Sequence, residues 1–437
     1  MSKSTASRAT SSPFAPKPSK RREADAFDAL RRTSCRYCAK ALDAPFLDLG
    51  DMPLANAFTE QQTGGDEFRC PLSVTYCDRC HLVQLLHIVP REQMFSRYLY
   101  VSSTSATFRR HFSDYAAAIC DWFPKGAVGP VVDVGSNDGL LVKSFLDRGV
   151  VAMGVEPAAN LSDEANRSGI PTVNRYFDES CARALVSQYG PAGVVTANNV
   201  FAHVEDVDSF CRAVDVLLHQ DGLFVLEVPY LVTMCRQMLF DMIYHEHLAY
   251  LSVSAINFVL AKHGFSIVDI QEVPSHGGSL RVFAQKRAGT RNGDGSWAQY
   301  MEQEREAGYH ALAGYAEFAQ RVHEVRARLR KVVAEESRQG RTIAGYGAPA
   351  KANTLINFCG WTGNDIRYLV DDNVIKQGLY APGSQIPVVG AEQLTAQPPD
   401  TILVFAWNFA EEIIGRMRAQ VPASVRWIVP LPEPRYV

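Results

Sequence analysis

Two pairs of cysteines, Cys35/Cys38 and Cys77/Cys80, stand near the N-terminus of the sequence. Each C-x2-C pair lets two thiolates from one tight turn reach the same ion, and two pairs complete the tetrahedral four-thiolate shell of structural Zn²⁺. Because a closed shell leaves no open coordination position, the predicted zinc is structural and not catalytic. The alternatives are four buried thiols, or a c-type haem attachment at 77–81, which would require export.

A second group of polar side chains, Tyr-His-Glu-His at 244–247, stands inside the apolar stretch "LFDMIYHEHLAYLS". Such side chains are costly to bury without partners, so they indicate a metal site, an acid–base site or a satisfied core network. The zinc-protease pattern H-E-x-x-H is excluded because Ala249 occupies the place of its second histidine. His245 and His247 could still bind a metal together.

The segment "VVDVGSNDGLLVKSF" (131–145) predicts a strand, a glycine turn and a helix. Gly135 and Gly139 permit close backbone approach to a ligand, but their spacing is G-x-x-x-G and not the dinucleotide G-x-G-x-x-G. About 20 residues later, Glu156 ends the next strand, where a carboxylate can bind ribose hydroxyls. Asp133 could reach an amino group or a water molecule. An acidic loop without Lys or Arg suits S-adenosylmethionine (SAM) better than NAD, and a generic α/β turn is the alternative.

A second glycine turn stands near the C-terminus, in "TIAGYGAPAKANTL" (342–355). Its G-x-G-x-x-A spacing between a predicted strand and a predicted helix resembles a dinucleotide fingerprint. It therefore supports an alternative function, that of an NAD-dependent oxidoreductase. Lys351 at the start of the helix would also suit a diphosphate group.

The elements that must hold these groups divide the 437 residues into several units, since the chain is too long for one core. Residues 1–32, rich in Ser, Pro, Arg and Lys, predict a disordered basic tail. Residues 33–90 form the cysteine-pair unit. Strand-like and helical runs alternate over 91–290 and again over 341–437, which predicts two α/β units with parallel sheets. The charged segment 291–340 has a helical period and predicts a connector.

The overall composition argues against several partners. A net charge of −3 gives no general attraction to nucleic acid or to membranes. No apolar run approaches the roughly 18 residues of a membrane span, and no signal-peptide core is present. We therefore expect a cytoplasmic protein that binds neither membrane nor nucleic acid. RNA binding by the cysteine unit would be the alternative, but it usually requires basic patches with aromatic residues.

Several motifs occur in one order along the chain. After the cysteine pairs come "LGDMPLANAF", "VVDVGSNDG", "NNVFAHVEDV", "LEVPYL", "YHEHLAYLS", "GGSLRVF" and "GYGAPAKANTLIN". Over residues 33–437 this set resembles the SAM-dependent nucleotide-sugar C-methyltransferases of deoxysugar pathways, best known as NDP-hexose 3-C-methyltransferases. The resemblance implies an α/β protein with an N-terminal four-cysteine zinc domain, a central class I SAM methyltransferase (Rossmann-like) domain and a C-terminal Rossmann-like domain that binds the nucleotide sugar.

The resemblance also implies methyl transfer to C3 of a dTDP-linked 4-keto-deoxysugar. Such a carbon becomes nucleophilic when a base removes its proton and the enolate oxygen is stabilised. The catalytic trio of the family falls on Tyr244, Glu246 and His247, with His247 as the general base. If residues 241–251 are helical, Tyr244 and His247 are i, i+3 neighbours on one face. His203, at the end of a predicted strand, is a second acid–base candidate.

The remaining site residues follow from the motifs and the resemblance. The expected cofactor contacts are Asp133, Gly135, Asn137, Gly139, Glu156 and Asn199. The expected substrate contacts are Tyr98, Ser275, His276, Arg281, Lys351, Asn353 and Asp372. For Ser275, His276 and Arg281, a purely structural turn is the alternative, because glycine pairs mark turns in many contexts.

Overall fold

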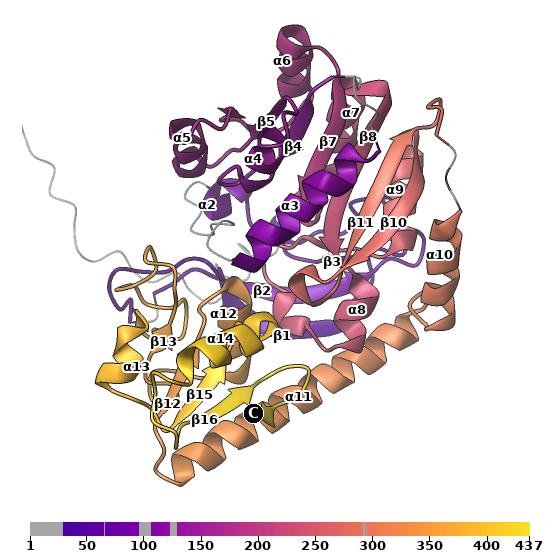
Figure 1. Cartoon of the computed structure of the whole chain (residues 1–437). Helices are drawn as coiled ribbons and strands as arrows, with labels where there is room; N and C mark the ends of the chain where they lie inside the picture. Colours follow the sequence, from indigo (N-terminus) through magenta and orange to yellow (C-terminus); the bar gives the residue numbers. More distant parts are fainter. Residues whose placement is uncertain (1–28, 65, 96–105, 123–128, 292, 294) are drawn as a thin grey trace, which may run out of the picture.

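The computed structural model describes residues 29–64, 66–95, 106–122, 129–291, 293 and 295–437. Three sheets follow one another along the chain, as Figure 1 shows. Most of the predicted basic tail and the predicted substrate contact Tyr98 lie outside the described residues. Within the described part, no helix has the length and apolar character needed to cross a membrane.

The first sheet is antiparallel, in the order β1-β2-β3-β9. Its strands are β1 (Leu47–Pro53), β2 (Arg69–Tyr76), β3 (Val83–Leu85) and β9 (Ala249–Tyr250). The first three come from the predicted zinc domain, and the turn between β2 and β3 carries the second cysteine pair. The fourth strand comes from the middle of the chain, directly after the Tyr-His-Glu-His motif, and pairs with β3. The first sheet therefore includes a segment of the methyltransferase unit.

The central sheet has seven strands in the order β10-β11-β8-β7-β4-β5-β6. Its strands are β4 (Val131–Val134), β5 (Ala152–Val155), β6 (Thr172–Val173), β7 (Ala192–Asn198), β8 (Leu218–Pro229), β10 (Phe265–Val273) and β11 (Ser279–Lys286). The five neighbouring strands β8, β7, β4, β5 and β6 pair in parallel. In contrast, β11 is antiparallel to both β8 and β10. This is the class I methyltransferase sheet, and it confirms the predicted fold class.

Helices accompany this sheet as the alternating sequence predicts. They are α2 (Arg91–Phe95), α3 (Ala106–Cys120), α4 (Leu140–Leu146), α5 (Ala159–Arg167), α6 (Glu179–Tyr189), α7 (Val207–Leu217), α8 (Leu231–Arg236) and α9 (Val253–Lys262). Several begin at side-chain caps: Asp206 accepts the amide hydrogen of Ser209, and Ser252 accepts that of Ala255. The sheet strands β4 and β5 are buried along their whole length, as strands covered on both faces must be.

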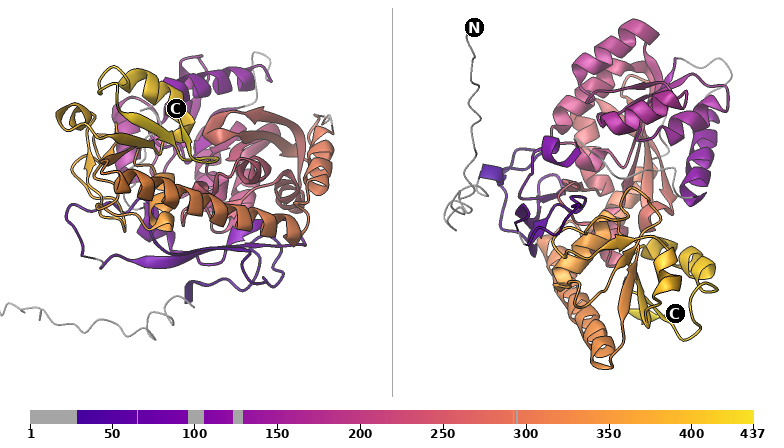
Figure 2. Two further views of the ribbon diagram at one scale, coloured as in Figure 1. Left: turned by 90° about the horizontal axis from the view of Figure 1, so that it is seen from below. Right: turned by 90° about the vertical axis from the view of Figure 1, so that its left-hand side faces the viewer.

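Two helices, α10 (Ser296–Glu306) and α11 (Leu312–Arg338), occupy the segment predicted as a helical connector. Figure 2 shows α11 running past the first sheet to the C-terminal unit. Near its start, Tyr315 packs against Tyr76 of β2, with ring centroids 4.8 Å apart. Near its end, the buried Glu336 accepts hydrogen bonds from Thr401 and Arg426 of the third sheet. The connector thus fastens the first sheet to the third.

The third sheet has the order β14-β13-β12-β15-β16-β17, parallel except for the last pair. Its strands are β12 (Ile343–Tyr346), β13 (Leu369–Val370), β14 (Val388–Val389), β15 (Thr401–Val404), β16 (Arg426–Val429) and β17 (Arg435–Tyr436). Its helices are α12 (Ala350–Cys359), α13 (Glu392–Ala396) and α14 (Ala410–Met417). This is the Rossmann-like α/β arrangement that the sequence predicts for the C-terminal unit.

Candidate active site and metal centre

The four predicted zinc ligands come together. The sulfur atoms of Cys35, Cys38, Cys77 and Cys80 all lie within 4.8 Å of one another. Two of the contacts, Cys35 to Cys80 and Cys38 to Cys77, measure 3.4 Å. A tetrahedral Zn²⁺ with bonds of about 2.3 Å needs sulfurs about 3.8 Å apart, so the cluster fits the ion. Gln84 donates a hydrogen bond to the Cys35 sulfur at 3.2 Å and supports the shell from outside.

The cysteine cluster is the one group in the described part of the chain whose His, Cys, Asp or Glu atoms could hold a metal. The alternative of a metal between His245 and His247 is not supported. The Nε2 atom of His245 lies 3.1 Å from the carbonyl oxygen of Cys70, and Nε2 of His247 lies 2.8 Å from the hydroxyl of Tyr244. The two imidazoles therefore bind different partners.

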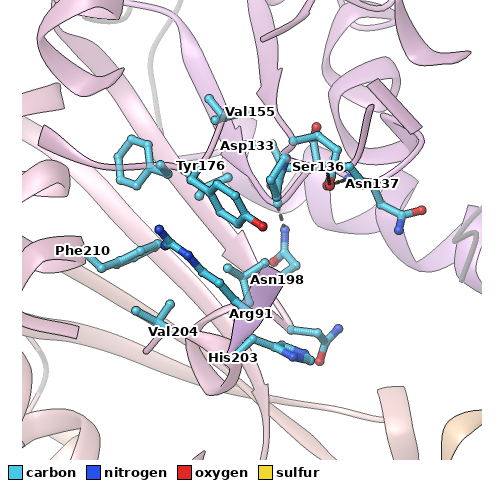
Figure 3. Close-up of a pocket in the computed structure, with 18 of the residues that line it drawn as sticks. Arg91, Asp133, Ser136, Asn137, Val155, Tyr176, Asn198, His203, Val204 and Phe210 are labelled. Atoms are coloured by element: carbon cyan, nitrogen blue, oxygen red, sulfur yellow. Dashed lines mark hydrogen bonds between the residues drawn. The ribbon is translucent and has the colours of Figure 1, made fainter. Parts of the chain in front are cut away.

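A cavity of about 510 Å³ opens at the C-terminal ends of β4, β5 and β7. This is where parallel α/β sheets bind ligands. Figure 3 shows its cofactor side, with Asp133, Asn137 and His203 around the opening. Among the predicted residues it is lined by Asp133, Gly135, Asn137, Glu156, Asn199, His203, Tyr244, His247 and His276. Most of the predicted cofactor and catalytic residues therefore meet in one cavity, whereas Gly139 and Glu246 do not line it.

The cofactor side of this cavity is acidic and buried. Asp133 accepts hydrogen bonds from the Thr196 hydroxyl at 2.6 Å and from the Asn198 amide at 3.3 Å. Burial nevertheless raises the pKa of Asp133 to about 7. A cationic group bound beside it would restore the charged form.

The glycine loop adopts left-handed backbone angles at Gly135 (φ 68°) and Asn137 (φ 52°). A side chain at Gly135 would collide with Val200, at 2.4 Å. The two oxygens of Glu156 accept the amide hydrogens of Asn137 and Ala158, at 2.9 and 2.8 Å. Glu156 thus fixes the loop on which the cofactor is expected to lie, while burial raises its pKa.

Gly139 lies outside this cavity. It precedes α4 with φ 80°, and a Cβ atom there would stand 2.7 Å from the side chain of Ile170. Its lack of a side chain is therefore required by packing and backbone conformation, and direct cofactor contact remains a prediction.

The helix over 241–251 that the sequence analysis considered does not form. A 3-10 turn at Phe240–Met242 is followed by a turn in which the amide of His247 donates to the carbonyl of Tyr244 at 2.9 Å, and then by β9. Pairing with β3 of the first sheet overrides the helical preference of this apolar stretch. The expected neighbourhood of Tyr244 and His247 nevertheless exists, because the turn brings the two rings to 4.0 Å.

Both nitrogens of His247 have partners. Nδ1 lies 2.8 Å from the carbonyl oxygen of Met242, so it carries the proton and donates. Nε2 is then the lone-pair nitrogen and accepts the hydroxyl of Tyr244 at 2.8 Å. Burial holds the pKa of His247 well below its ordinary value, and the neighbouring His203, whose ring lies 4.8 Å away, lowers it further. His247, which lines the cavity, is therefore a neutral imidazole whose basic nitrogen is covered by the Tyr244 hydroxyl.

The other two side chains of the motif point elsewhere. Glu246 accepts a hydrogen bond from the Asn56 side chain at 2.6 Å, and Asn56 belongs to the first unit of the chain. The orienting partner of His247 is the Met242 carbonyl. His245 contacts β2 through Cys70. The motif therefore faces the cavity with its first and last residues, and it faces the zinc domain with the two residues between them.

The turn before β11 holds two predicted substrate contacts, Ser275 and His276, and β11 itself holds the third, Arg281. Only His276 lines the cavity. The hydroxyl of Ser275 donates to Glu227 at 2.8 Å, and the guanidinium of Arg281 forms a buried ion pair with the same carboxylate at 2.9 Å. Arg281 also lies over the ring of Tyr115 at 3.7 Å. Ser275 and Arg281 therefore contact other protein side chains, and contact of either residue with a sugar remains a prediction.

The predicted contacts of the C-terminal unit lie apart from this cavity. Asn353 is buried and donates to the carbonyl of Ala55 at 2.7 Å. Asp372 accepts the hydroxyl of Tyr346 at 2.9 Å at the end of the third sheet. Lys351 lies over the ring of Trp407 at 3.9 Å, and burial lowers its pKa to about 8.

One backbone amide in the glycine loop of the C-terminal unit is already hydrogen-bonded within the protein. The amide of Ala348, which would face a phosphate in a dinucleotide site, donates to the carboxylate of Asp371 at 2.7 Å. This amide is therefore already used and does not bind the pyrophosphate of a dinucleotide. The geometry of the loop therefore gives no support to the NAD-dependent alternative.

Sequence reasoning missed two features of the site. Glu227, in the apolar run "LFVLEVP", is fully buried and accepts hydrogen bonds from His111, Ser275 and Arg281. A lone carboxylate in a buried strand is itself the signal, because such a group needs partners. Arg91 and Tyr176 also line the cavity, where the guanidinium stacks on the ring at 4.2 Å. No spacing rule connects these two residues.

Comparison with known proteins gives consistent results along the chain. Residues 35–95 match a putative zinc binding domain, residues 108–270 a methyltransferase domain, and residues 274–432 a C-methyltransferase C-terminal domain. The chain is 35% identical to the C-methyltransferase NovU of Streptomyces niveus over 404 residues, which cover 92% of this chain and 96% of the relative.

Several solved methyltransferase structures match about two fifths of the chain. The glycopeptide N-methyltransferase MtfA complexed with SAM is 14% identical, with a TM-score of 0.32 over 40% of this chain and 93% of that one. The SAM-bound magnesium protoporphyrin IX methyltransferase ChlM of Synechocystis PCC 6803 is 14% identical, with a TM-score of 0.30 over 41% and 79% of the two chains. On the identity with NovU and the three matching domains, the chain belongs to the family of SAM-dependent C-methyltransferases with a structural zinc domain.

Proposed function

We propose that the protein transfers the methyl group of SAM to C3 of a dTDP-linked 4-keto-deoxysugar through an enolate. The observation that carries the proposal is the neutral His247, which lines the same cavity as the predicted cofactor residues and has its basic nitrogen on the Tyr244 hydroxyl. A carbon next to a ketone needs such a base before it can attack a methyl group. The deoxysugar, its dTDP group and the C3 position come from the family resemblance.

In this mechanism the Nε2 atom of His247 removes the proton from C3. The proton stays on Nδ1, where its hydrogen bond to the Met242 carbonyl keeps the ring in the required tautomer. The hydroxyl of Tyr244 must leave Nε2 when the substrate arrives. It can then donate to the enolate oxygen that forms at C4. SAM supplies the electrophilic methyl group.

The other predicted residues bind the cofactor, support the base or bind the nucleotide. Asp133 and Glu156 hold the amino group and the ribose of the cofactor, with Asn137, Asn199 and the glycine loop around them. His203 lies beside His247 with a pKa that burial lowers to about 4, and it keeps the base free of a neighbouring positive charge. Lys351, Asn353 and Asp372 belong to the unit expected to bind the nucleotide.

The first test is calorimetric titration of the zinc-loaded protein with S-adenosylhomocysteine, with dTDP, and with NAD as a control. Binding of the first two is expected, and binding of NAD is not. If S-adenosylhomocysteine binds and dTDP does not, the methyltransferase acts on another substrate. Binding of NAD alone would refute the proposal.

The base is tested by His247→Asn. We expect this change to lower turnover by about 10³-fold, within the range of general base catalysis, while affinity for S-adenosylhomocysteine is unchanged. Turnover and calorimetry are measured on the same preparation. A variant that still turns over at the wild-type rate would exclude His247 from the base role.

A further inference from the structure

The turn at Ser275–Gly277 presents a third histidine to the cavity. His276 has left-handed backbone angles (φ 53°, ψ 23°), although it is not a glycine. A histidine pays a conformational cost in this region, so its surroundings must hold it there. Its ring lines the cavity that Tyr244, His203 and His247 also line.

The buried carboxylate of Glu227 holds this turn. It accepts hydrogen bonds from Ser275 at 2.8 Å and from His111 at 2.7 Å, and it pairs with Arg281 at 2.9 Å. Burial opposes ionisation of Glu227, but the hydrogen bond from His111 and the charges of His111 and Arg281 keep its pKa below the ordinary value. A charged carboxylate therefore fixes the residue immediately before His276.

The C-terminal unit closes the other side of the turn. A Cβ atom at Gly277 would stand 2.9 Å from the ring of Trp407, so the two units are in direct contact here. The ammonium group of Lys351 lies over the same ring. Burial, together with the charge of Lys351, lowers the pKa of His276 to about 4. His276 is thus a neutral imidazole, which carries a single N–H donor.

The three histidines differ in what their nitrogens do. Those of His247 bind Met242 and Tyr244, and the ring of His203 faces the carbonyls of Glu246 and Asn199. The Nδ1 atom of His276 is buried and has no hydrogen-bond partner among the residues that the structure describes. The rings of His276 and Phe108 pack in a T-shaped arrangement, with centroids 5.4 Å apart. Because Nδ1 is enclosed, the nitrogen that can meet a ligand oxygen in the cavity is Nε2, and a neutral imidazole can carry its single N–H there.

We propose that His276 is a further catalytic residue, whose N–H donates to the substrate carbonyl oxygen as it becomes an enolate, and that Glu227 positions it through Ser275. The inference rests on the proposed function. His247 takes the C3 proton, the C–H electron pair forms the C3–C4 double bond, and the carbonyl pair moves to the oxygen held by His276. When C3 then bonds to the methyl carbon, the carbonyl re-forms and the C–S pair leaves with sulfur. A neutral imidazole can stabilise such an oxygen without giving up its proton.

Proton exchange isolates this step. The full-length zinc-loaded protein is incubated in D₂O with S-adenosylhomocysteine and dTDP-4-keto-6-deoxyglucose, and deuterium entering next to the ketone is followed by mass spectrometry. No methyl donor is present, so the signal reports enolate formation. His276→Asn is the main variant, because asparagine tolerates left-handed angles and its amide is shorter than the imidazole.

We expect His276→Asn to slow exchange about 100-fold at saturating sugar, as loss of one oxyanion donor does, with unchanged affinity for S-adenosylhomocysteine. Glu227→Gln should slow it about tenfold, since the turn remains but is less firmly held. The control is Glu304→Gln. Glu304 is equally buried and hydrogen-bonds Tyr230 and Ser254, away from the cavity, so its loss should leave the exchange rate unchanged.

Other outcomes have distinct meanings. If His276→Asn raises KM for the sugar but leaves exchange at saturation unchanged, His276 only binds the ground state and the inference is overturned. If this variant fails to bind S-adenosylhomocysteine, Ser275→Ala decides, and wild-type exchange in it also overturns the inference. If the wild-type protein gives neither exchange nor methyl transfer, the proposed function itself fails and the inference with it.

Discussion

The buried carboxyl group of Asp133 should make cofactor affinity depend on pH near neutrality. Burial raises the pKa of Asp133 to about 7, although Thr196 and Asn198 donate hydrogen bonds that favour the charged form. We expect the carboxylate to bind the ammonium group of the cofactor. An ammonium ion is attracted by the charged carboxylate and gains little from the neutral acid.

The size of the effect follows from the pKa. With a value of about 7, Asp133 is about 9% ionised at pH 6 and about 91% at pH 8. If only the ionised form binds, affinity rises about tenfold between these two pH values, or about 1.4 kcal/mol. The direction is fixed: binding strengthens as pH rises through 7.

The assay is calorimetric titration with S-adenosylhomocysteine, which carries the same ammonium group as SAM, at both pH values. Asp133→Asn should bind weakly and without this pH dependence. Thr196→Val removes a donor that lowers the pKa, so the rise in affinity should move to higher pH. Equal affinity of the wild-type protein at the two pH values, or a persisting tenfold rise in Asp133→Asn, would refute the reasoning.

Three further changes test other parts of the structure. Cys38→Ser should remove stoichiometric zinc, measured by mass spectrometry of the metal, and lower the free energy of unfolding by about 4 kcal/mol. Tyr244→Phe should lower turnover about 100-fold without changing S-adenosylhomocysteine affinity, because it removes the donor beside His247. Burial lowers the pKa of Lys351 from 10.5 to about 8, so the folded protein binds fewer protons than the unfolded chain between these values and stability rises with pH there. Lys351→Met should lose this rise in denaturant titrations; if the rise persists, another group causes it.

Local spacing predicted the metal site and the cofactor loop well. The cysteine pairs and the strand–glycine–helix unit at 131–145 are short segments whose geometry depends mainly on their own residues, and both appear as the sequence predicts. The helix considered over 241–251 does not form, for the opposite reason. The backbone of Ala249 and Tyr250 pairs with β3, a strand far away in the sequence, and local periodicity carries no information about that pairing.

The partners of buried charges were the other feature that could not be predicted. Arg281 was expected at the substrate because it follows a glycine turn. In the structure, antiparallel pairing sets Arg281 opposite Glu227 on the neighbouring strand, and the two side chains form a buried ion pair. The sequence shows that Glu227 and Arg281 each need a partner, but only the strand register brings them together.

The pairing of β9 with β3 also gives the structural zinc a connection to catalysis. The second cysteine pair closes the turn between β2 and β3, and β3 pairs with β9, which begins two residues after His247. His245 binds the backbone of β2, and Glu246 binds Asn56 of the first unit. Thus His245, Glu246 and β9 all connect the turn that bears His247 to the zinc domain. None of the four cysteines lines the cavity, yet the position of Nε2 depends on the strands beside the cysteine cluster. Loss of zinc should therefore reduce proton exchange even where the cofactor still binds to the central sheet.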